Sequence, residues 1–404
     1  MIHYMTTNGL GTAWVGNELR ILMRENVPFR LHALFRAPIT FFESDDIHEL
    51  VKTTNYLYRL NAISFLGSIL AAPFRFRGRF LSALWNALTG PRESLMVRAK
   101  GCWHLLVACH WARQLAGEEV SLIHSQWIHS GGTVAMYGAW LLGVPFSFTG
   151  HAADLFRDRA ALRDKIRRAD FIVCISKFHE RFFLEEGARP EQLRLAYCGI
   201  DPSHFAPKAP GPPNDPPRIL ASGRLVEKKG FQYLIEACRV LHERGFLFRC
   251  VIAGSGPLEN ELRVLTRKEG LSDVVEITGQ ALSQEAIPDF MKSGDIYCLP
   301  CVWASDNDVD GLPQMLMEAM SCGLPAVSTD LVGIPDLVIH GETGLLASPR
   351  DAEGLANQLA RLLEDPSLAT KLAESGRQHV LSRFDIATSL DSLVSEFRSY
   401  LGNR

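Results

Sequence analysis

The sequence predicts an α/β protein of two doubly wound domains, each built on a parallel sheet with helices on both faces. The chain has 404 residues, which is too long for one typical hydrophobic core. In its second half, strand-like apolar runs alternate with helical patterns, and this alternation is typical of a parallel sheet. Six prolines among residues 206–217 exclude a regular element there and indicate a linker between two domains.

The first domain is expected over residues 1–205. Apolar runs predict its strands at 2–5, 29–34, 122–124, 146–149 and 171–175. The loop after the first run carries Gly9 and Gly11, which we assign to the donor side of a ligand site. Residues 51–117 interrupt this pattern with a basic and apolar stretch, which is expected to be a helical insert.

The second domain is expected over residues 218–380, followed by a C-terminal helix at 381–404. Strand runs at 218–222, 247–253, 274–278, 295–300 and 325–329 alternate with helical patterns at 231–244, 258–269, 284–292 and 313–321. In such a sheet, ligands bind at the carboxyl ends of the strands. The motifs described next stand at those ends.

The stretch DGLPQMLME, from Asp310 to Glu318, begins in a loop and enters a helix. Pro313 suits the first helical turn, because the backbone N–H that it lacks would be unpaired there. The N–H groups around Gly311, Leu312 and Pro313 form an anion site supported by the helix dipole. Carboxylates at Asp310 and Glu318 are suited to accept hydrogen bonds from hydroxyl groups. This combination indicates a nucleotide-sugar pocket; an ordinary strand-loop-helix turn with a solvated Asp is the alternative.

A second loop carries two cations at the start of a helix. Gly223 and Arg224 follow the strand at 218–222, and Lys229 precedes the next helical pattern. Two cations beside free N–H groups fit a diphosphate, although scattered surface cations remain an alternative. After the strand at 247–253, Gly254 and Gly256 allow close approach of a ligand to the backbone.

In order and spacing, these elements resemble the retaining glycosyltransferases of family 4, which have the GT-B fold. The resemblance extends to FTGHAADLF at 148–156, CISK at 174–177, CGID at 198–201 and HGETGLL at 340–346. It implies two domains facing a central cleft, a last helix that crosses back to the first domain, and a nucleoside diphosphate sugar as donor. It also implies a front-face reaction, in which the leaving phosphate takes the proton of the acceptor.

The resemblance further implies roles for single residues. The matching histidine of the family lies against the donor sugar, which makes His151 a catalytic candidate together with Arg224, Lys229 and Asp310. His124 is expected to be structural or to line the acceptor side, and Asp154 is placed on that side as well. Many relatives have Glu where this chain has Asp310, and the first loop lacks their Ser-Glu-Thr-Phe run.

We expect no bound metal and no cofactor. Residues 306–311 read DNDVDG and begin like a calcium loop, but position twelve is Met317 where a glutamate is required. A metal role for these carboxylates is the alternative to a solvated acidic loop. The nine cysteines show no framework, and no signal peptide is evident, which predicts a cytoplasmic protein with reduced thiols.

The predicted function is retaining sugar transfer from a nucleoside diphosphate sugar to a glycan or a lipid-linked acceptor, in cell-surface polysaccharide or glycolipid synthesis. A nucleotide-sugar epimerase and a non-catalytic nucleotide-sugar-binding subunit are the alternatives. A net charge of −3 argues against a nucleic-acid partner. Residues 51–117 carry nine cations and one anion among aromatic and aliphatic residues, which suits the inner face of an anionic membrane. Packing inside the first domain is the alternative for this segment.

Overall fold

The computed structural model describes residues 1–11, 13–36, 45–207 and 213–402. The chain divides into two compact units, which are described separately. Unit 1 comprises Met1–Ala196 and Leu390–Arg404, and unit 2 comprises Tyr197–Ser389. The division therefore falls about ten residues before the expected linker at 206–217, of which residues 208–212 lie outside the described part of the chain.

Among the described residues of unit 1, seven strands form one sheet in which every pair is parallel. Their order is β3-β2-β1-β4-β5-β6-β7, and Tyr4 stands in register with Leu31 on one side and His124 on the other. The bounds are β1 Ile2–Thr6, β2 Phe29–Ala33, β3 Asn55–Tyr56, β4 Leu122–Ser125, β5 Phe146–Gly150, β6 Phe171–Cys174 and β7 Leu193–Leu195. The five predicted strands are present, and the two short strands at the sheet edges had not been predicted.

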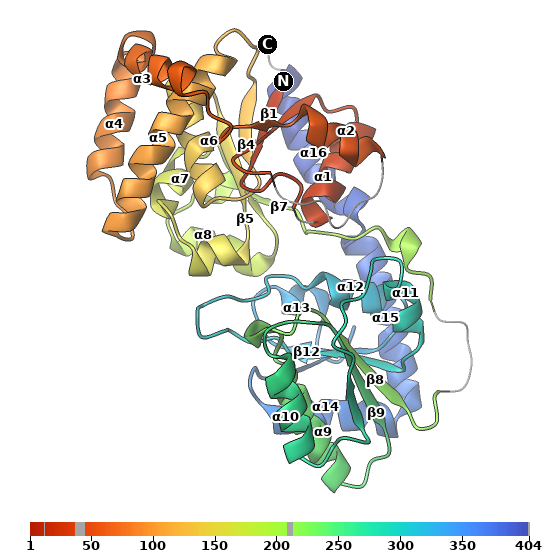
Figure 1. Ribbon diagram of the computed structural model, residues 1–404. Coiled ribbons are helices and arrows are strands. Elements are labelled where there is room, and N and C mark those ends of the chain that lie inside the picture. The colour runs from red at the N-terminus through yellow and green to blue at the C-terminus, as the bar shows by residue number, and fades with distance from the viewer. Residues whose placement is uncertain (12, 37–44, 208–212, 403–404) are drawn as a thin grey trace. The chain divides into compact units, whose positions relative to one another are not determined.

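Helices cover both faces of this sheet (Figure 1). They are α1 Ala13–Arg24, α2 Asp45–Thr53, α3 Ala62–Phe76, α4 Gly78–Thr89, α5 Leu95–Leu115, α6 Ser130–Leu142, α7 Leu162–Arg168 and α8 Lys177–Glu185. A π-helical turn, η1, spans Ala153–Arg157, and a 3-10 turn, η2, spans Pro190–Gln192. The expected helical insert is thus three helices, α3 to α5.

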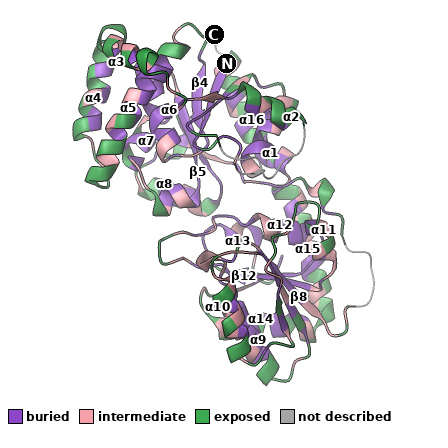
Figure 2. Ribbon diagram, in the orientation of Figure 1, coloured by how far each residue is buried: buried purple, intermediate pink, exposed green. Residues whose placement is uncertain are grey.

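The core of unit 1 lies on both sides of the sheet. On one face the Trp111 ring of α5 packs where Gly138 of α6 lacks a side chain, next to Ile123 of β4. On the other face the ring of Phe397 meets His124 edge-on at 5.1 Å between ring centroids. Phe397 belongs to the last helix, α16 Ile386–Gly402, whose residues from Leu390 onward are part of unit 1. Trp111, Ile123, His124 and Phe397 are all fully buried, and Figure 2 shows buried residues along the strands of this sheet.

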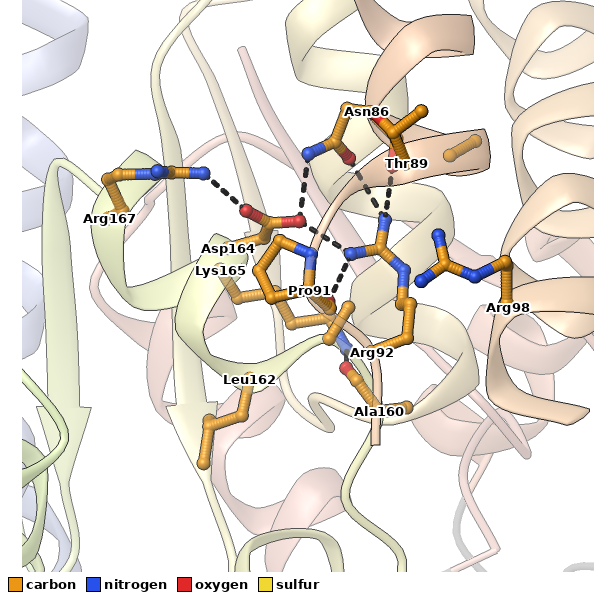
Figure 3. A network of polar contacts seen from close by, with 12 residues as sticks. Asn86, Thr89, Pro91, Arg92, Arg98, Ala160, Leu162, Asp164, Lys165 and Arg167 are labelled. Carbon is orange, nitrogen blue, oxygen red and sulfur yellow. Dashed lines mark hydrogen bonds and ion pairs between the residues drawn. The ribbon is translucent and has the colours of Figure 1, made fainter. Parts of the chain in front are cut away.

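A buried polar network ties the helical insert to the rest of unit 1 (Figure 3). Arg92 donates to the Asp164 carboxylate at 2.6 Å, and both side chains are almost fully buried, at 1% and 0% exposure. Asn86 donates to the same carboxylate at 2.9 Å, and Arg92 donates to the Tyr137 hydroxyl at 2.8 Å. Because a buried charge is stable only when it is paired and hydrogen-bonded, this network fixes α4 and the start of α5 against α6 and α7.

Among the described residues of unit 2, six parallel strands form a sheet in the order β10-β9-β8-β11-β12-β13. Their bounds are β8 Arg218–Ser222, β9 Arg249–Ala253, β10 Val275–Ile277, β11 Ile296–Leu299, β12 Ala326–Thr329 and β13 Leu345–Ala347. The helices are α9 Phe231–Glu243, α10 Glu259–Lys268, α11 Ile287–Lys292, α12 Gln314–Ser321, α13 Ile334–Leu337, α14 Ala352–Glu364 and α15 Pro366–Arg383, with short turns at η3 Pro202–His204 and η4 Glu227–Lys229. The predicted β-α alternation is confirmed.

The C-terminal helical region differs from its predicted division at residue 380. Helix α15 runs to Arg383, and α16 starts at Ile386. Between them, the backbone of Ile200 pairs with Phe384 and Ile386, which interrupts the helix. No helix within the described residues is long and apolar enough to cross a membrane.

Candidate functional site

The candidate site of unit 2 lies where its strand order reverses. From β8 the chain adds β9 and β10 on one side, and from β11 it adds β12 and β13 on the other. In an open α/β sheet, the carboxyl ends of strands at such a reversal flank a crevice that receives ligands. The loops that carry Lys229 and Asp310 follow β8 and β11, so both emerge at this edge.

Glycines allow these loops to touch one another. Gly254 has φ +158°, and a Cβ atom there would collide with the carbonyl oxygen of Gly223. Gly230 has φ +69°, and a Cβ atom there would collide with the carbonyl oxygen of Pro300. A Cβ atom on Gly256 would lie 2.6 Å from the carbonyl oxygen of Leu225. The predicted donor-side residues Gly254 and Gly256 thus have a packing reason that is independent of any ligand.

Two lysines converge on one carboxylate. The Lys229 ammonium lies 2.6 Å from Oδ2 of Asp310, and the Lys228 ammonium lies 3.1 Å from Oδ1. Lys228 also lies 3.2 Å from the Asp308 carboxylate. Sequence reasoning had placed Lys229 and Asp310 in the site but had not paired them, and it had missed Lys228.

This pairing sets the charges of the site. Burial alone would raise the pKa of the Asp310 carboxyl, but the ammonium groups of Lys229 and Lys228 outweigh it and lower the pKa to about 2. Burial alone would lower the pKa of Lys229, but Asp310 outweighs burial and raises it. Both groups are therefore ionised at neutral pH. In formal charge, Lys228 and Lys229 are balanced by Asp308 and Asp310, so the further positive charge for an anionic ligand comes from the exposed Arg224 on the same loop.

Glu318 lies in the fifth position of α12 and is buried, at 7% exposure. Burial raises the pKa of its carboxyl to about 7, against the opposing effect of Lys229. Among the described residues, its Oε2 atom has no hydrogen-bond partner. A buried acceptor without a partner is unfavourable, so this atom is suited to accept a hydrogen bond from a ligand hydroxyl.

The start of α12 is held by its neighbours. Pro313 caps the helix with an extended backbone, and Leu312 before it is buried. The carbonyl oxygen of Gly311 accepts a hydrogen bond from the N–H of Gly333 at 3.0 Å. Pro313 thus stands one residue before the helix, a shift of one position from the expected first turn. Arg224, by contrast, lies exposed on the loop after β8.

In unit 1, His151 follows the end of β5 and packs between two tryptophans. Its ring centroid lies 4.8 Å from that of Trp127 and 5.5 Å from that of Trp14. Burial lowers the pKa of His151 to about 3, so the imidazole is neutral. Within the described part of the chain, His151 Nε2, Trp14 Nε1 and Gln126 Oε1 are buried without hydrogen-bond partners. These open polar atoms mark the end of the sheet as a place for a polar ligand; the role of His151 beside a donor sugar stays a prediction of the resemblance.

A buried carboxyl group next to this cluster had not been found from the sequence. Glu18 accepts hydrogen bonds from the Tyr4 hydroxyl at 2.6 Å and from the Gln126 amide at 2.9 Å. Burial raises the pKa of Glu18 to about 7. Its only signal in the sequence is the spacing of four from Trp14, which places both on one face of α1.

The structure favours the structural role for His124. The ring is fully buried, and its nitrogens lie 2.9 Å from the Ser147 hydroxyl and 3.2 Å from the Thr149 hydroxyl. Asp154 also has a structural role. Its two carboxylate oxygens accept hydrogen bonds from the backbone N–H groups of Ile128 at 2.6 Å and His151 at 3.2 Å. Asp154 therefore positions the loop of His151.

The first loop holds Gly9 in the left-handed region, with φ +56°, and Gly9 is buried. The N–H of Gly11 donates to the carbonyl oxygen of Asn8 at 3.1 Å, which closes a turn. Thr12, the next residue, lies outside the described residues.

The carboxylates of the acidic loop at 306–310 contact Lys228 and the backbone of the loop itself. Asp308 and Asp310 face Lys228, and Asp306 Oδ1 accepts from the N–H of Asp308 at 2.9 Å. Over the described residues, no group of three or more His, Cys, Asp or Glu side chains is arranged to hold a metal ion.

Comparison with protein families matches two consecutive parts of the chain. The family model described as "Glycosyl transferases group 1" matches residues 203–379, and the model described as "Glycosyltransferase Family 4" matches residues 74–204. The segment matched by the first model contains every candidate residue of unit 2, and the segment matched by the second model contains His151.

Two curated relatives are named for the biosynthesis of colanic acid and of amylovoran. A glycosyltransferase assigned to colanic acid biosynthesis in Escherichia coli K12 is 38% identical over 232 residues, which are 56% of this chain and 57% of the relative. An amylovoran biosynthesis glycosyltransferase of Erwinia amylovora is 34% identical over 241 residues, 58% of this chain and 59% of the relative. The chain thus spans less than two thirds of the length of these relatives.

Among solved structures, an Anabaena protein in complex with UDP-glucose matches with a TM-score of 0.68. The match covers 98% of this chain and 99% of that protein, at 17% sequence identity. At this identity the likeness establishes the fold.

Proposed function

Because this chain belongs to the group 1 glycosyltransferases of family 4, we propose that it transfers a sugar from a nucleoside diphosphate sugar to a hydroxyl group with retention of the anomeric configuration. The observation that carries the proposal is the cluster of Lys229, Asp310 and Glu318 at the strand-order reversal of unit 2. Together with Arg224 on the same loop as Lys229, it combines cations for a diphosphate with acceptors for hydroxyl groups.

In this proposal unit 2 holds the donor. The ribose hydroxyls donate to Glu318, whose Oε2 atom has no partner among the described residues. The hydroxyls of the sugar donate to Asp310, because an ionised carboxylate offers about four lone-pair sites and the two lysines occupy only some of them. Before the start of α12, Gly311 and Leu312 supply N–H groups for the phosphates, whereas Pro313 has none.

The cations act on the charge that develops as the bond to the diphosphate breaks. Lys229 is fixed by Asp310, so its ammonium is already oriented before the reaction. Arg224 is exposed and free to close on a bound phosphate. Preorganised charge of this kind stabilises a leaving group without reorganisation at the moment of reaction. The leaving phosphate then takes the proton of the acceptor hydroxyl, as the family resemblance implies.

The acceptor is a glycan or a lipid-linked saccharide in the synthesis of a cell-surface polysaccharide or glycolipid. The two relatives named for the biosynthesis of colanic acid and of amylovoran support this context. The UDP-glucose complex of the Anabaena protein supports a nucleoside diphosphate sugar as donor.

The test is a binding panel of UDP-, GDP- and ADP-linked sugars, followed by product analysis with acceptors extracted from cells. We expect release of the nucleoside diphosphate only with an acceptor, and NMR of the product should show the anomeric configuration of the donor. Isomerisation of the donor without an acceptor would identify an epimerase instead. Donor binding without turnover over the whole panel would identify a non-catalytic subunit. Glu318→Gln serves as the binding-deficient control.

A further inference from the structure

The helical insert of unit 1 exposes large apolar side chains along its outer side. Helix α3 presents a stripe with helical spacing, in which Ile63 is 86% and Phe74 is 82% exposed; Trp85 of α4 is 70% exposed. The residues that we define as the apolar surface are Ile63, Leu66, Leu70 and Phe74 of α3, Leu81, Trp85 and Leu88 of α4, and Leu95 and Met96 of α5. Figure 2 shows exposed residues along α3 and α4.

The polarity of α3 is inverted relative to an ordinary surface helix. A helix at the surface normally buries its large apolar residues and exposes polar ones. In α3 the buried residues are Ser68 and Ala72, whereas isoleucine, leucine and phenylalanine face outward. A contiguous exposed apolar face of this kind marks an interaction surface.

This exposure does not reflect a loosely attached insert. The inner side of α4 is anchored by Asn86, which joins Arg92 and Asp164 in the buried network of Figure 3. The hydroxyl of Ser68 lies 2.9 Å from His110 of α5. The insert is therefore held by specific contacts on one side, while its apolar side faces outward.

Cations gather at one end of the apolar surface. Arg75, Arg77 and Arg79 occupy the junction of α3 and α4 and are exposed. A hollow of about 760 Å³ lies at this junction and is lined by Arg75, Phe76, Arg77, Gly78, Arg79, Leu141 and Leu142. From residue 54 to residue 117 the sequence contains one acidic residue, Glu93, and its carboxylate accepts from the N–H groups of Ala161 and Leu162. The outer side of the insert is thus apolar and positive.

We propose that the apolar surface and the Arg75–Arg77–Arg79 cluster together form a docking site for the surface of an anionic lipid bilayer. The apolar side chains enter the boundary between headgroups and acyl chains, and the arginines bind lipid phosphates. Helix α3 has 15 residues, which is about 22 Å of helix and short of the ~30 Å of a bilayer core, so the insert lies on the membrane.

A second copy of the chain is the competing occupant, and the charges disfavour it. A symmetric dimer places the same patch of both subunits face to face. The shared interface would then hold six arginines, Arg75, Arg77 and Arg79 of each copy, while residues 54–117 of each copy contain a single acidic residue, Glu93, to offset them. An anionic bilayer supplies the complementary charge.

Flotation with vesicles at low salt tests the proposal without donor or acceptor, so its outcome is independent of the proposed sugar transfer. We expect the chain to float with phosphatidylcholine vesicles that contain phosphatidylglycerol, and far less with phosphatidylcholine alone. The change Arg75→Gln, Arg77→Gln and Arg79→Gln should weaken binding by roughly 100-fold, because each cation contributes about a fivefold factor. The change Phe74→Ser with Trp85→Ser should weaken it at least ~10-fold.

Matched controls come from unit 2. Leu247 is as exposed as Phe74, at 82%, and Val264 is also exposed, so Leu247→Ser with Val264→Ser removes two exposed apolar side chains elsewhere. Replacement of the exposed Arg267, Arg361 and Arg383 by Gln removes the same charge. Both controls should bind like the original chain. Absence of flotation at low salt, or flotation unchanged in the insert variants, would overturn the proposal. Self-association in the absence of vesicles that Phe74→Ser with Trp85→Ser abolishes would assign the surface to a second copy instead.

Discussion

The Lys229 ammonium lies 2.6 Å from the Asp310 carboxylate, whose other oxygen lies 3.1 Å from Lys228. The sequence predicts Lys229 as a contact of the phosphates and Asp310 as an acceptor for hydroxyl groups, each independent of the other. Their pairing means that the carboxylate also orients the cation. A single substitution at either residue therefore alters both functions of the site.

Replacement of Lys229 by Ala should lower kcat by roughly 10²–10³, and Arg224→Ala should do the same. The reason is that both cations act on charge that grows as the diphosphate leaves. The measurement is steady-state transfer with a saturating donor, with Lys268→Ala, an exposed lysine of unit 2, as the control. Near-normal kcat in both variants would refute the assignment.

Asp310→Asn should reduce transfer more than it reduces binding of the bare nucleoside diphosphate, whereas Glu318→Gln should reduce both. Asp310 is assigned to the sugar and to the orientation of Lys229, and Glu318 is assigned to the ribose. Calorimetric titration measures the affinity of each variant for the nucleoside diphosphate. Comparison of these affinities with the transfer rates separates the role of Asp310 from that of Glu318. Equal losses of affinity would contradict this division of roles.

Binding of the nucleoside diphosphate should release a proton from Glu318 below pH 7. Burial raises the pKa of this carboxyl to about 7, so Glu318 is protonated in most molecules of the free protein at pH 6. Ligand hydroxyls donate to the ionised form, which lowers the pKa in the complex. Affinity should thus rise with pH up to about 7 and level off above it.

The measurement of that proton is calorimetry at pH 6 in two buffers of different ionisation enthalpy. In Glu318→Gln the protons that Glu318 releases on binding should be missing. The difference between the two proteins then separates Glu318 from titration of the ligand phosphate itself. Identical proton release in the original chain and in the variant would show that Glu318 does not titrate on binding.

Activity should survive EDTA. In the proposed site, Lys229 and Arg224 supply the positive charge that a divalent ion supplies in other sugar transferases, and Lys228 faces Asp308 and Asp310. The measurement is the transfer rate after chelation and after addition of magnesium or manganese. Loss of activity that either ion restores would instead make Asp306 and Asp308 metal ligands.

Replacement of Arg92 by Met should lower the free energy of unfolding by about 3 kcal/mol, since the buried Asp164 carboxylate loses its buried cation and keeps only the largely exposed Arg167. Urea denaturation measures the change. Arg98→Met, which removes a neighbouring arginine that bonds to a backbone carbonyl group, is the control and should have a much smaller effect. An equal loss of unfolding free energy in both variants would show that the Arg92–Asp164 ion pair contributes no more to stability than the contact of Arg98.

Patterns of local residues determined the central strands and most helices. The five strands predicted in each half are present, because apolar runs bounded by turn residues leave few other conformations. The strands β3, β7 and β13 have two or three residues and were missed, since so short a segment carries no period and is set by its neighbour in the sheet. The last helix was predicted to start at residue 381, five positions before Ile386, because the position of the break depends on pairing with Ile200.

The sequence by itself determined which residue types the candidate site of unit 2 contains and that they stand at strand ends. Only the tertiary structure decided their partners. The pairing of Lys229 with Asp310, 81 positions apart in the chain, follows from the neighbouring positions of β8 and β11 in the sheet. Likewise, α3 is apolar on nearly all sides in the sequence, and only its packing in the fold, where Ser68 bonds to His110 of α5, decided that Ser68 turns inward and Phe74 outward. The physical reason is the same in both cases: local patterns fix the backbone conformation, whereas burial and ion pairing depend on segments that meet only in the folded chain.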